Sequence, residues 1–343
     1  MALYTTPEFT RYAAVHQNLN GEGDARPTAL QIIKDNGLEG KLTDKNILIT
    51  GCSSGLGVET ARALAATGAH IFCTARSLEK GQAALADILS PGKVDLLHLD
   101  LESLASVRKF AAEFLAASHG KLDILINNAG VMAIPQSTTA DGFETQFGVN
   151  HLAHFLLFQL LKPALVASST PTSASRVVAV SSLGHRYFAP TLSDMQLREP
   201  GAYDPNRAYA HSKTANIWFA NYIDRHYGSS TTHPIHALSL HPGGIWTGLQ
   251  DHLPGMDAMK EIPAVQRYMK SPAQGAATTV WAAVGECWEG KGGVYLDDCQ
   301  VCPPVPQPSY GLVDRGYEKW AYDVESEEKL WETSNELVGF QEA

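Results

Sequence analysis

Short apolar runs alternate with segments of helical period from residue 46 onward, and this alternation limits the folds that the chain can adopt. Near-continuous apolar strands separated by helices are typical of a parallel sheet that helices cover on both faces. The pattern therefore predicts one doubly wound α/β domain over residues 46–297, with a mostly parallel seven-stranded sheet flanked by helices. The runs are Asn46–Thr50, His70–Thr74, Val94–Leu99, Leu122–Ile126, Arg176–Ser181, Ile235–Leu240 and the weaker Gly293–Leu296.

The two ends of the chain depart from this pattern. Residues 1–45 are polar and contain glycine, and we interpret them as a surface extension that leads into the first strand. Residues 298–343 combine a proline-rich strap, which starts at Cys299, with a helix candidate over Ser326–Val338. Because one helix cannot bury a core of its own, we expect this C-terminal extension to pack on the main domain.

Charge and hydropathy exclude several functional classes. The 343 residues include 36 acidic and 26 basic side chains, which gives a net charge of −10, and no Lys/Arg cluster occurs. We therefore expect neither a nucleic-acid partner nor binding to an anionic membrane surface. The first 30 residues lack the apolar run of a signal sequence, and no uninterrupted apolar stretch has the length of a membrane span. These features predict a cytoplasmic protein without a membrane span.

Cysteines and histidines give no sign of a disulfide framework or a metal site. The five cysteines are an odd and sparse set, which fits a reducing compartment. The 13 histidines do not combine with cysteines or carboxylates at zinc-like spacing, so we expect no metal. Cys299 and Cys302 form a Cys-x-x-Cys pair without the second half of a zinc site, and a redox role is the alternative for them.

A glycine-rich turn, Gly51-Cys-Ser53-Ser54-Gly55-Leu56-Gly57, directly follows the first predicted strand and opens a helix. Glycines at such a turn let the backbone bend sharply and approach a pyrophosphate, while the helix N-terminus offers its N–H groups to the phosphates. A glycine-rich turn alone is weak evidence and can be a structural loop, but the strand–turn–helix context favours a dinucleotide site.

Several motifs, taken in order, resemble those of the classical short-chain dehydrogenase/reductase family, and the retinol-dehydrogenase-like branch is the most similar. The resemblance covers about residues 40 to 300 and implies a Rossmann fold. Three segments resemble the branch: Gly40-Lys41-Leu42, Asn150-His151-Leu152-Ala153-His154-Phe155 and Lys329-Leu330-Trp331. The family motifs are Thr50-Gly51-x-x-x-Gly55-Leu56-Gly57, Asn127-Asn128-Ala129-Gly130, Tyr209-x-x-x-Lys213 and Pro242-Gly243-Gly244-Ile245-Trp246-Thr247.

The end of the second strand favours NADP(H) over NAD(H). An NAD enzyme of this architecture usually has an acidic residue there for the ribose 2′-OH, whereas this strand ends in Arg76. A guanidinium can bind a 2′-phosphate in fork geometry, and Ser53 is a candidate second contact. The alternative for Arg76 is a solvated side chain at the start of the next helix. Asp100 and Leu101 resemble the adenine-contacting pair of the family, and Asp100 also fits a simple helix cap.

Tyr209 and Lys213 lie four residues apart and share one face of the expected helix. A free tyrosine has a pKa of about 10 and transfers protons poorly at neutral pH. We expect the ammonium of Lys213 and a cationic nicotinamide to lower the pKa of the phenol, so that Tyr209 acts as general acid and base. Lys213 can also bind the nicotinamide ribose. A Tyr-x-x-x-Lys pair alone is common on solvated helices.

The resemblance assigns two further catalytic residues. Ser182, at the end of the fifth strand, corresponds to the serine that polarises the substrate carbonyl, whereas Ser181 is expected to point away. Asn150 corresponds to the asparagine that holds a water beside Lys213, and a buried structural asparagine is the alternative. Ser182 precedes Tyr209 by 27 positions, more than in compact family members, so an inserted loop is expected over His185–Asp204.

The same resemblance places the remaining cofactor contacts. Asn128, Ala129 and Gly130 leave room for the adenosine ribose. Pro242 and Gly243 form a turn beside the cofactor, while the main chain of Ile245 and the hydroxyl of Thr247 bind the carboxamide, which implies transfer of the pro-S hydride.

The resemblance implies NADPH-dependent reduction of a carbonyl substrate, reversible to alcohol oxidation. Aromatic and thioether side chains in Trp246–Met269 and His185–Tyr203 suggest an apolar or ring-containing substrate, although an ordinary packed lid has the same composition. Two alternatives are a reductase of a conjugated C=C bond or polycyclic ring and a non-catalytic NADP-binding sensor. Homodimers or homotetramers are usual in such families. The sequence decides neither the substrate, nor the direction, nor the oligomeric state.

Overall fold

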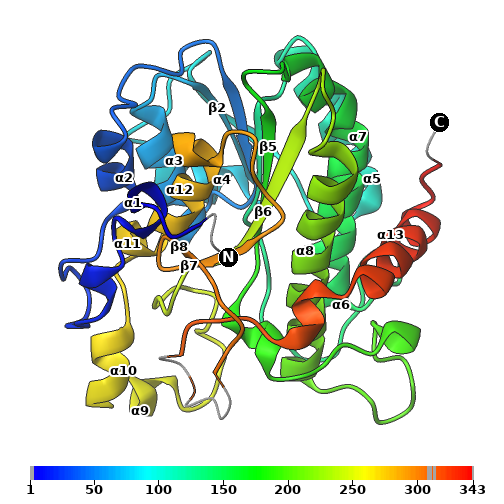
Figure 1. Cartoon of the computed structure of the whole chain (residues 1–343). Coiled ribbons are helices and arrows are strands. Elements are labelled where there is room, and N and C mark those ends of the chain that lie inside the picture. Colours follow the sequence, from blue (N-terminus) through cyan, green and yellow to red (C-terminus); the bar gives the residue numbers. More distant parts are fainter. Residues whose placement is uncertain (1–3, 307–310, 312–313, 342–343) are drawn as a thin grey trace.

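The computed structural model describes residues 4–306, 311 and 314–341, and their centre is an eight-stranded sheet in the order β3-β2-β1-β4-β5-β6-β7-β8 (Figure 1). All pairs from β3 to β7 are parallel, and helices cover both faces, as the alternating sequence pattern predicts. The strands are β1 (Asn46–Ile49), β2 (His70–Ala75), β3 (Val94–His98), β4 (Ile124–Asn127), β5 (Ser175–Val180), β6 (Ile235–His241), β7 (Tyr295–Asp297) and β8 (Gln300–Val301).

Strand β8 adds an eighth, antiparallel strand to the seven that the sequence predicts. Asp298 and Cys299 join it to β7 with φ values of +55° and +52°, the geometry of a tight two-residue hairpin. The strand is two residues long and runs into the proline-rich strap, so its sequence carries no period-2 pattern. The domain boundary expected at residue 297 therefore falls between two paired strands.

The helices divide into two layers because each strand alternates its side chains. Leu48 of β1 faces one core, and its neighbours Ile47 and Ile49 face the other. The first core contains residues of α5, α7, α8 and α13, and the second contains residues of α1, α2, α3, α4 and α12. These helices are α1 (Pro7–Thr10), α2 (Ala29–Asp35), α3 (Gly55–Ala65), α4 (Leu78–Leu85), α5 (Leu104–Ala117), α7 (Ala153–Ser168), α8 (Pro205–Tyr227), α12 (Ala277–Val284) and α13 (Val324–Val338).

Shorter helical pieces connect these layers. The α-helical pieces are α6 (Thr145–Phe147), α9 (Met256–Lys260), α10 (Pro263–Tyr268) and α11 (Pro272–Gly275), and Gly148–Leu152 is a π-helical turn. Turns of 3₁₀ helix occupy Ala14–His16, Leu183–Arg186, Leu192–Asp194, Glu286–Trp288 and Lys319–Tyr322. The sequence predicts an inserted loop over His185–Asp204. The turn Leu192–Asp194 lies within this segment, and the turn Leu183–Arg186 overlaps its start.

The helical stretch Thr145–Ser168 is long and apolar enough to cross a membrane by length and composition. Of its most apolar 18-residue window, 67% is buried inside the protein. Core helices pass the same test, so this stretch is weak evidence for a membrane span. Its C-terminal part, α7, packs against α5 in the first core.

The C-terminal segment packs on the main domain through α13. Trp331 stacks on Tyr222 of α8 with ring centroids 3.9 Å apart and meets Phe155 of α7 edge-on at 4.8 Å. Asp323 caps the helix by accepting a hydrogen bond from the backbone N–H of Ser326. Part of the proline-rich strap, residues 307–310, lies outside the described residues.

The N-terminal segment is more deeply buried than the expected surface extension. Phe9 and Ile32 are fully buried in the second core, where Phe9 contacts Trp288 edge-on at 5.1 Å between ring centroids. Helix α2 packs along α12. The amphipathic piece Ala29–Lys34 of the sequence corresponds to α2, but its packing was not predicted because its partners lie about 250 positions away.

Arg26 joins this segment to the chain ahead of α11. Its guanidinium donates hydrogen bonds to the carbonyls of Tyr268 at 2.7 Å and Met269 at 2.6 Å, and it pairs with Asp24 at 2.8 Å. The side chain is almost fully buried, at 3% exposure for the residue. A buried charge with this many partners holds two distant segments in one arrangement.

We predict that Arg26→Met lowers the free energy of unfolding by about 3 kcal/mol, because two carbonyls and Asp24 lose their buried donor. Arg11 pairs with Asp35 but is half exposed, so the control Arg11→Met should cost less than about 1 kcal/mol. Urea unfolding of both variants gives the comparison. Equal losses would show that Arg26 does not hold the two segments together.

Candidate active site

The glycine-rich turn connects β1 to α3 and has no room for side chains at two of its glycines. Gly51 has a φ of +78°, and a Cβ there would lie 2.8 Å from the Cβ of Ala129. A Cβ on Gly57 would lie 2.2 Å from the carbonyl oxygen of Gly51. Ser54 precedes α3 and makes no side-chain capping bond within the described structure, so its hydroxyl is available to a ligand at the helix N-terminus.

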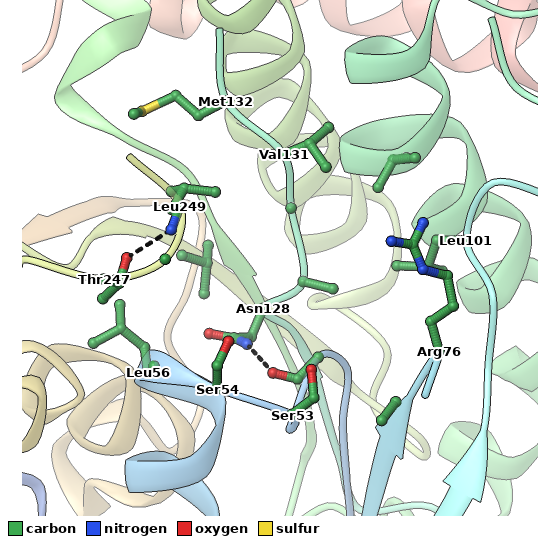
Figure 2. Close-up of a pocket in the computed structure, with 18 of the residues that line it drawn as sticks. Ser53, Ser54, Leu56, Arg76, Leu101, Asn128, Val131, Met132, Thr247 and Leu249 are labelled. Atoms are coloured by element: carbon green, nitrogen blue, oxygen red, sulfur yellow. Dashed lines mark hydrogen bonds between the residues drawn. The ribbon is translucent and has the colours of Figure 1, made fainter. Parts of the chain in front are cut away.

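A cavity of about 430 Å³ opens beside this turn, at the carboxyl ends of the strands. Figure 2 shows Ser53, Ser54, Leu56, Arg76, Leu101, Asn128 and Thr247 around it. Ligands bind at this edge in open α/β sheets, where the strand order reverses between β1 and β4. The predicted site residues that line the cavity are Gly51, Ser53, Ser54, Gly55, Leu56, Arg76, Asp100, Leu101, Asn128, Ala129, Gly130, Tyr209, Lys213, Pro242 and Thr247.

Thr50 fixes the segment after β4 against the turn. Its hydroxyl oxygen accepts hydrogen bonds from the backbone N–H groups of Asn128 and Ala129, both at 3.0 Å. The Asn128 side chain donates to the Thr50 carbonyl at 2.8 Å. The Asn-Asn-Ala-Gly motif therefore has a structural role, in addition to lining the cavity.

Lys213 on α8 is a buried cation beside Tyr209. Its ammonium lies 5.5 Å from the centroid of the Tyr209 ring and donates a hydrogen bond to the carbonyl of Val180 at 3.0 Å. The residue is 4% exposed. Removal from water disfavours the charged form and lowers the pKa of Lys213 from its ordinary 10.5 to about 8.

Burial raises the pKa of Tyr209, whereas Lys213 was expected to lower it. Removal from water raises the pKa of Tyr209 to about 12, and a hydrogen bond with the Ser182 side chain opposes this rise only in part. In the protein alone the pKa of Tyr209 is therefore raised and not lowered, and the expected joint effect of Lys213 and a cationic nicotinamide stays a prediction. The phenol is protonated at neutral pH, which is the form that donates a proton.

The two serines at the end of β5 have different surroundings. Ser181 is buried, and its hydroxyl donates to the carbonyl of Lys213 at 2.7 Å, so it anchors α8 to the sheet. Ser182 does not line the cavity, but its hydroxyl accepts a hydrogen bond from the N–H of Gly184 at 3.0 Å and reaches the Tyr209 phenol. The cavity is lined by Ser181 and not by Ser182, so the expectation that Ser181 points away is not confirmed, and the catalytic role of Ser182 stays a prediction.

Asn150 lies in the π-helical turn and is fully buried. Its side-chain oxygen accepts from the N–H of Val131 at 2.8 Å, and its side-chain nitrogen donates to the Val131 carbonyl and to Ser212, both at 2.9 Å. These three bonds position the loop after Gly130. They give the side chain a structural role, and its predicted part in holding a water beside Lys213 stays a prediction.

The loop after β6 carries the residues expected at the nicotinamide end. The Thr247 hydroxyl donates to Gln250 at 3.1 Å, and the Ile245 carbonyl accepts from Gln250 at 2.9 Å. Gly243 has a φ of +106°, and a Cβ there would lie 2.7 Å from the ammonium of Lys270. Gly243 and Ile245 support the loop and do not line the cavity, and neither does Gly57 in the first turn.

Sequence reasoning missed Lys270, which fixes this loop from behind. Its ammonium donates to the Pro242 carbonyl at 3.2 Å and to Asp298 in the β7–β8 turn at 2.6 Å. No local pattern marks this lysine, because its partners lie 28 positions away in each direction. Burial lowers the pKa of Lys270, but the negative charges of Asp298 and Asp297 raise it, and the pKa is raised overall.

The outer wall of the cavity is largely apolar. Val131, Met132 and Leu249 line it (Figure 2), as does Ile134. His252 approaches the carbonyl of Ala133 at 3.4 Å. Leu249 and His252 belong to the predicted covering segment Trp246–Met269. Among the described residues, none of His185–Tyr203 lines the cavity.

Three comparisons with known proteins agree with this arrangement. The sequence model of the short chain dehydrogenase family matches residues 45–194. The short-chain dehydrogenase/reductase prx1 of Penicillium roqueforti is 49% identical over 335 residues, which cover 97% of this chain and 96% of prx1. Human retinol dehydrogenase 12 is 36% identical over 88% of each chain. A short chain dehydrogenase from Burkholderia cenocepacia, solved with NADP, has a TM-score of 0.57 and 26% identity over 76% of this chain and 98% of its own.

The chain belongs to the short-chain dehydrogenase/reductase family. Within it, the chain lies in the retinol-dehydrogenase-like branch, as the sequence motifs indicate. Members of this family are oxidoreductases that act on small molecules.

Other groups that the sequence singles out lie apart from the site of this dehydrogenase/reductase. Cys299 and Cys302 are buried free thiols, and burial raises the pKa of Cys299 to about 12, which makes it a poor nucleophile and metal ligand. Within residues 4–306, 311 and 314–341, no group of three or more His, Cys, Asp or Glu side chains has the arrangement of a metal site.

The lowered pKa of Lys213 makes a prediction about stability. The folded-state pKa of about 8 lies below the ordinary 10.5, so the unfolded chain binds more protons between these pH values and stability rises with pH. Relative to Lys213→Met, the wild type should gain about 2 to 3 kcal/mol of unfolding free energy across this window. Urea unfolding at several pH values measures it, with the exposed Lys41→Met as control. Parallel profiles for the wild type and Lys213→Met would mean that the ammonium is not desolvated.

Proposed function

We propose that this chain reduces the carbonyl group of an apolar or ring-containing aldehyde or ketone with NADPH, reversibly, and that Tyr209 is the general acid and base. The observation that carries the proposal is that the Tyr209–Lys213 pair and the glycine-rich turn line one cavity. Tyr209 and Lys213 line the same cavity as the side-chain-free cradle of Gly51 and the helix N-terminus at Ser54.

The residues at the cavity fit a dinucleotide along its length. The glycine cradle and the start of α3 can take the pyrophosphate, and Asp100 with Leu101 can take the adenosine. Thr247 also lines the cavity, with its methyl group 3.4 Å from the position of a Cβ on Gly55, and we place the nicotinamide carboxamide at its hydroxyl. NADPH, when bound, supplies the hydride for the carbonyl carbon.

The chain itself supplies the proton and orients the reacting groups. Burial keeps Tyr209 protonated, so its phenol can donate to the carbonyl oxygen. Ser182 is in hydrogen-bonding range of the same phenol and is therefore placed to stabilise the same oxygen. Lys213 is cationic at neutral pH and can bind the nicotinamide ribose while it favours the phenolate left after proton transfer.

The apolar outer wall supports the proposed substrate class. Met132, Ile134 and Leu249 line the cavity, and an apolar group would leave water on binding against them. A cytoplasmic location, a homodimer or homotetramer, and transfer of the pro-S hydride stay predictions.

Tyr209→Phe should reduce turnover by about a hundredfold or more, because the acid is lost while the ring remains. Binding of NADPH, measured by isothermal titration, should change less than about twofold, since the phenol hydroxyl contributes little to ground-state cofactor binding. The surface tyrosine variant Tyr187→Phe is the matched control. Turnover of Tyr209→Phe at the wild-type level, over a panel of apolar aldehydes and ketones, would remove Tyr209 from the acid role.

Arg76 supports the preference for NADP(H), because it lines the adenine end of the cavity and can form paired hydrogen bonds to a 2′-phosphate. In Arg76→Ala, the ratio of kcat/KM for NADPH to that for NADH should fall about tenfold or more. Arg62→Ala removes a guanidinium of α3 that pairs with Asp87 and does not line the cavity, and it should leave the ratio unchanged. An unchanged ratio in Arg76→Ala would exclude this role.

A further inference from the structure

The adenine end of the cavity contains a carboxylate that the family motifs do not single out. Glu102 lines the cavity directly after Asp100 and Leu101, and its carboxylate forms an ion pair with the guanidinium of Arg76. The backbone N–H of Glu102 donates to the Asp100 side chain at 3.0 Å, which fixes the residue at this rim. Glu102 is therefore held beside the group that is proposed to bind the 2′-phosphate.

The charge balance at this end is unfavourable for a phosphate. Among the described residues that line the adenine end, one guanidinium, Arg76, faces two carboxylates, Asp100 and Glu102. A 2′-phosphate must therefore share Arg76 with the Glu102 carboxylate and must also bind next to a like charge. Both side chains are partly solvated, at 67% exposure for Arg76 and 41% for Glu102, so the pair can open when a ligand binds.

We infer that Glu102 is a specificity-determining residue that opposes the 2′-phosphate and so limits the preference of this enzyme for NADP(H) over NAD(H). This inference rests on the proposed cofactor site. In the absence of cofactor, Glu102 neutralises Arg76. NADP(H) has to displace the Glu102 carboxylate from the Arg76 guanidinium. NAD(H), which lacks the 2′-phosphate, binds with the Arg76–Glu102 pair intact.

The test uses two adenosine fragments that differ only in the 2′-phosphate, adenosine 2′,5′-bisphosphate and adenosine 5′-monophosphate, and it measures binding by isothermal titration. Glu102→Gln should tighten binding of the bisphosphate about two- to fivefold, the range for partly exposed charge pairs, and leave the monophosphate unchanged. In about 0.5 M NaCl this gain should shrink, because salt screens exposed charges.

Glu113→Gln is the matched control. Glu113 is an exposed carboxylate of α5 that pairs with Lys109 and does not line the cavity, so this variant makes the same charge change at a distance. It should alter binding of neither fragment. In the Arg76→Ala background, Glu102→Gln should give a smaller gain than in the wild type, because no guanidinium is released.

The possible failures differ from one another. If the wild type prefers the bisphosphate and Glu102→Gln weakens it or leaves it unchanged, Glu102 positions Arg76 or is neutral, and the inference is overturned while the NADP(H) proposal stands. If neither the wild type nor Glu102→Gln prefers the bisphosphate, Arg76 is not a 2′-phosphate site, and both fail.

Discussion

The close approach of two backbone segments at the reversal of strand order determines the geometry of the site. β1 and β4 are neighbours in the sheet, and the chain leaves both at the same edge. Gly51, after β1, comes so near Ala129, after β4, that a Cβ would lie 2.8 Å from the alanine side chain. Thr50 holds the two segments at this distance through its bonds to Asn128 and Ala129. The cavity, the cradle and the start of α3 all depend on this contact.

A second constraint is the desolvation of Tyr209 and Lys213. Burial moves both pKa values against ionisation, to about 12 for the phenol and about 8 for the ammonium. The phenol is therefore in its acid form at neutral pH. The packing of α8 on the end of β5 and the chain after it is therefore part of the proposed chemistry: a Cβ on Gly184 would lie 3.0 Å from the Tyr209 ring, and the Lys213 ammonium donates to the Val180 carbonyl at 3.0 Å.

Local patterns predicted the parts of the fold that repeat along the chain. The run Asn46–Thr50 matches β1, and the helix candidate Ser326–Val338 matches α13 within two residues. The glycine-rich turn and the Tyr209–Lys213 pair were predicted to form one site, and residues of both line one cavity. Their positions follow from neighbouring strands and from one face of a helix. These features depend on contacts between near neighbours in sequence or in the sheet.

Features that depend on distant contacts could not be predicted in this way. Arg26 is buried by carbonyls more than 240 positions away, and Lys270 by the turn at Pro242 and the hairpin at Asp298. The two-residue strand β8 has no periodicity. The pKa of Tyr209 depends on how much water the packed chain excludes, which spacing does not show. The pairing of Arg76 with Glu102 could not be predicted either, because it depends on how β2 and the loop after β3 lie relative to each other.

The most direct test of the central claim follows the deuterium from NADPH that is deuterated at the transferred position of C4. The wild type is incubated with a panel of apolar aldehydes, ketones and conjugated enones, and the products are analysed by NMR. Carbonyl reduction at Tyr209 predicts deuterium on the new carbinol carbon. Deuterium on a carbon derived from an alkene would contradict the account, and so would NADPH binding without transfer to any compound of the panel.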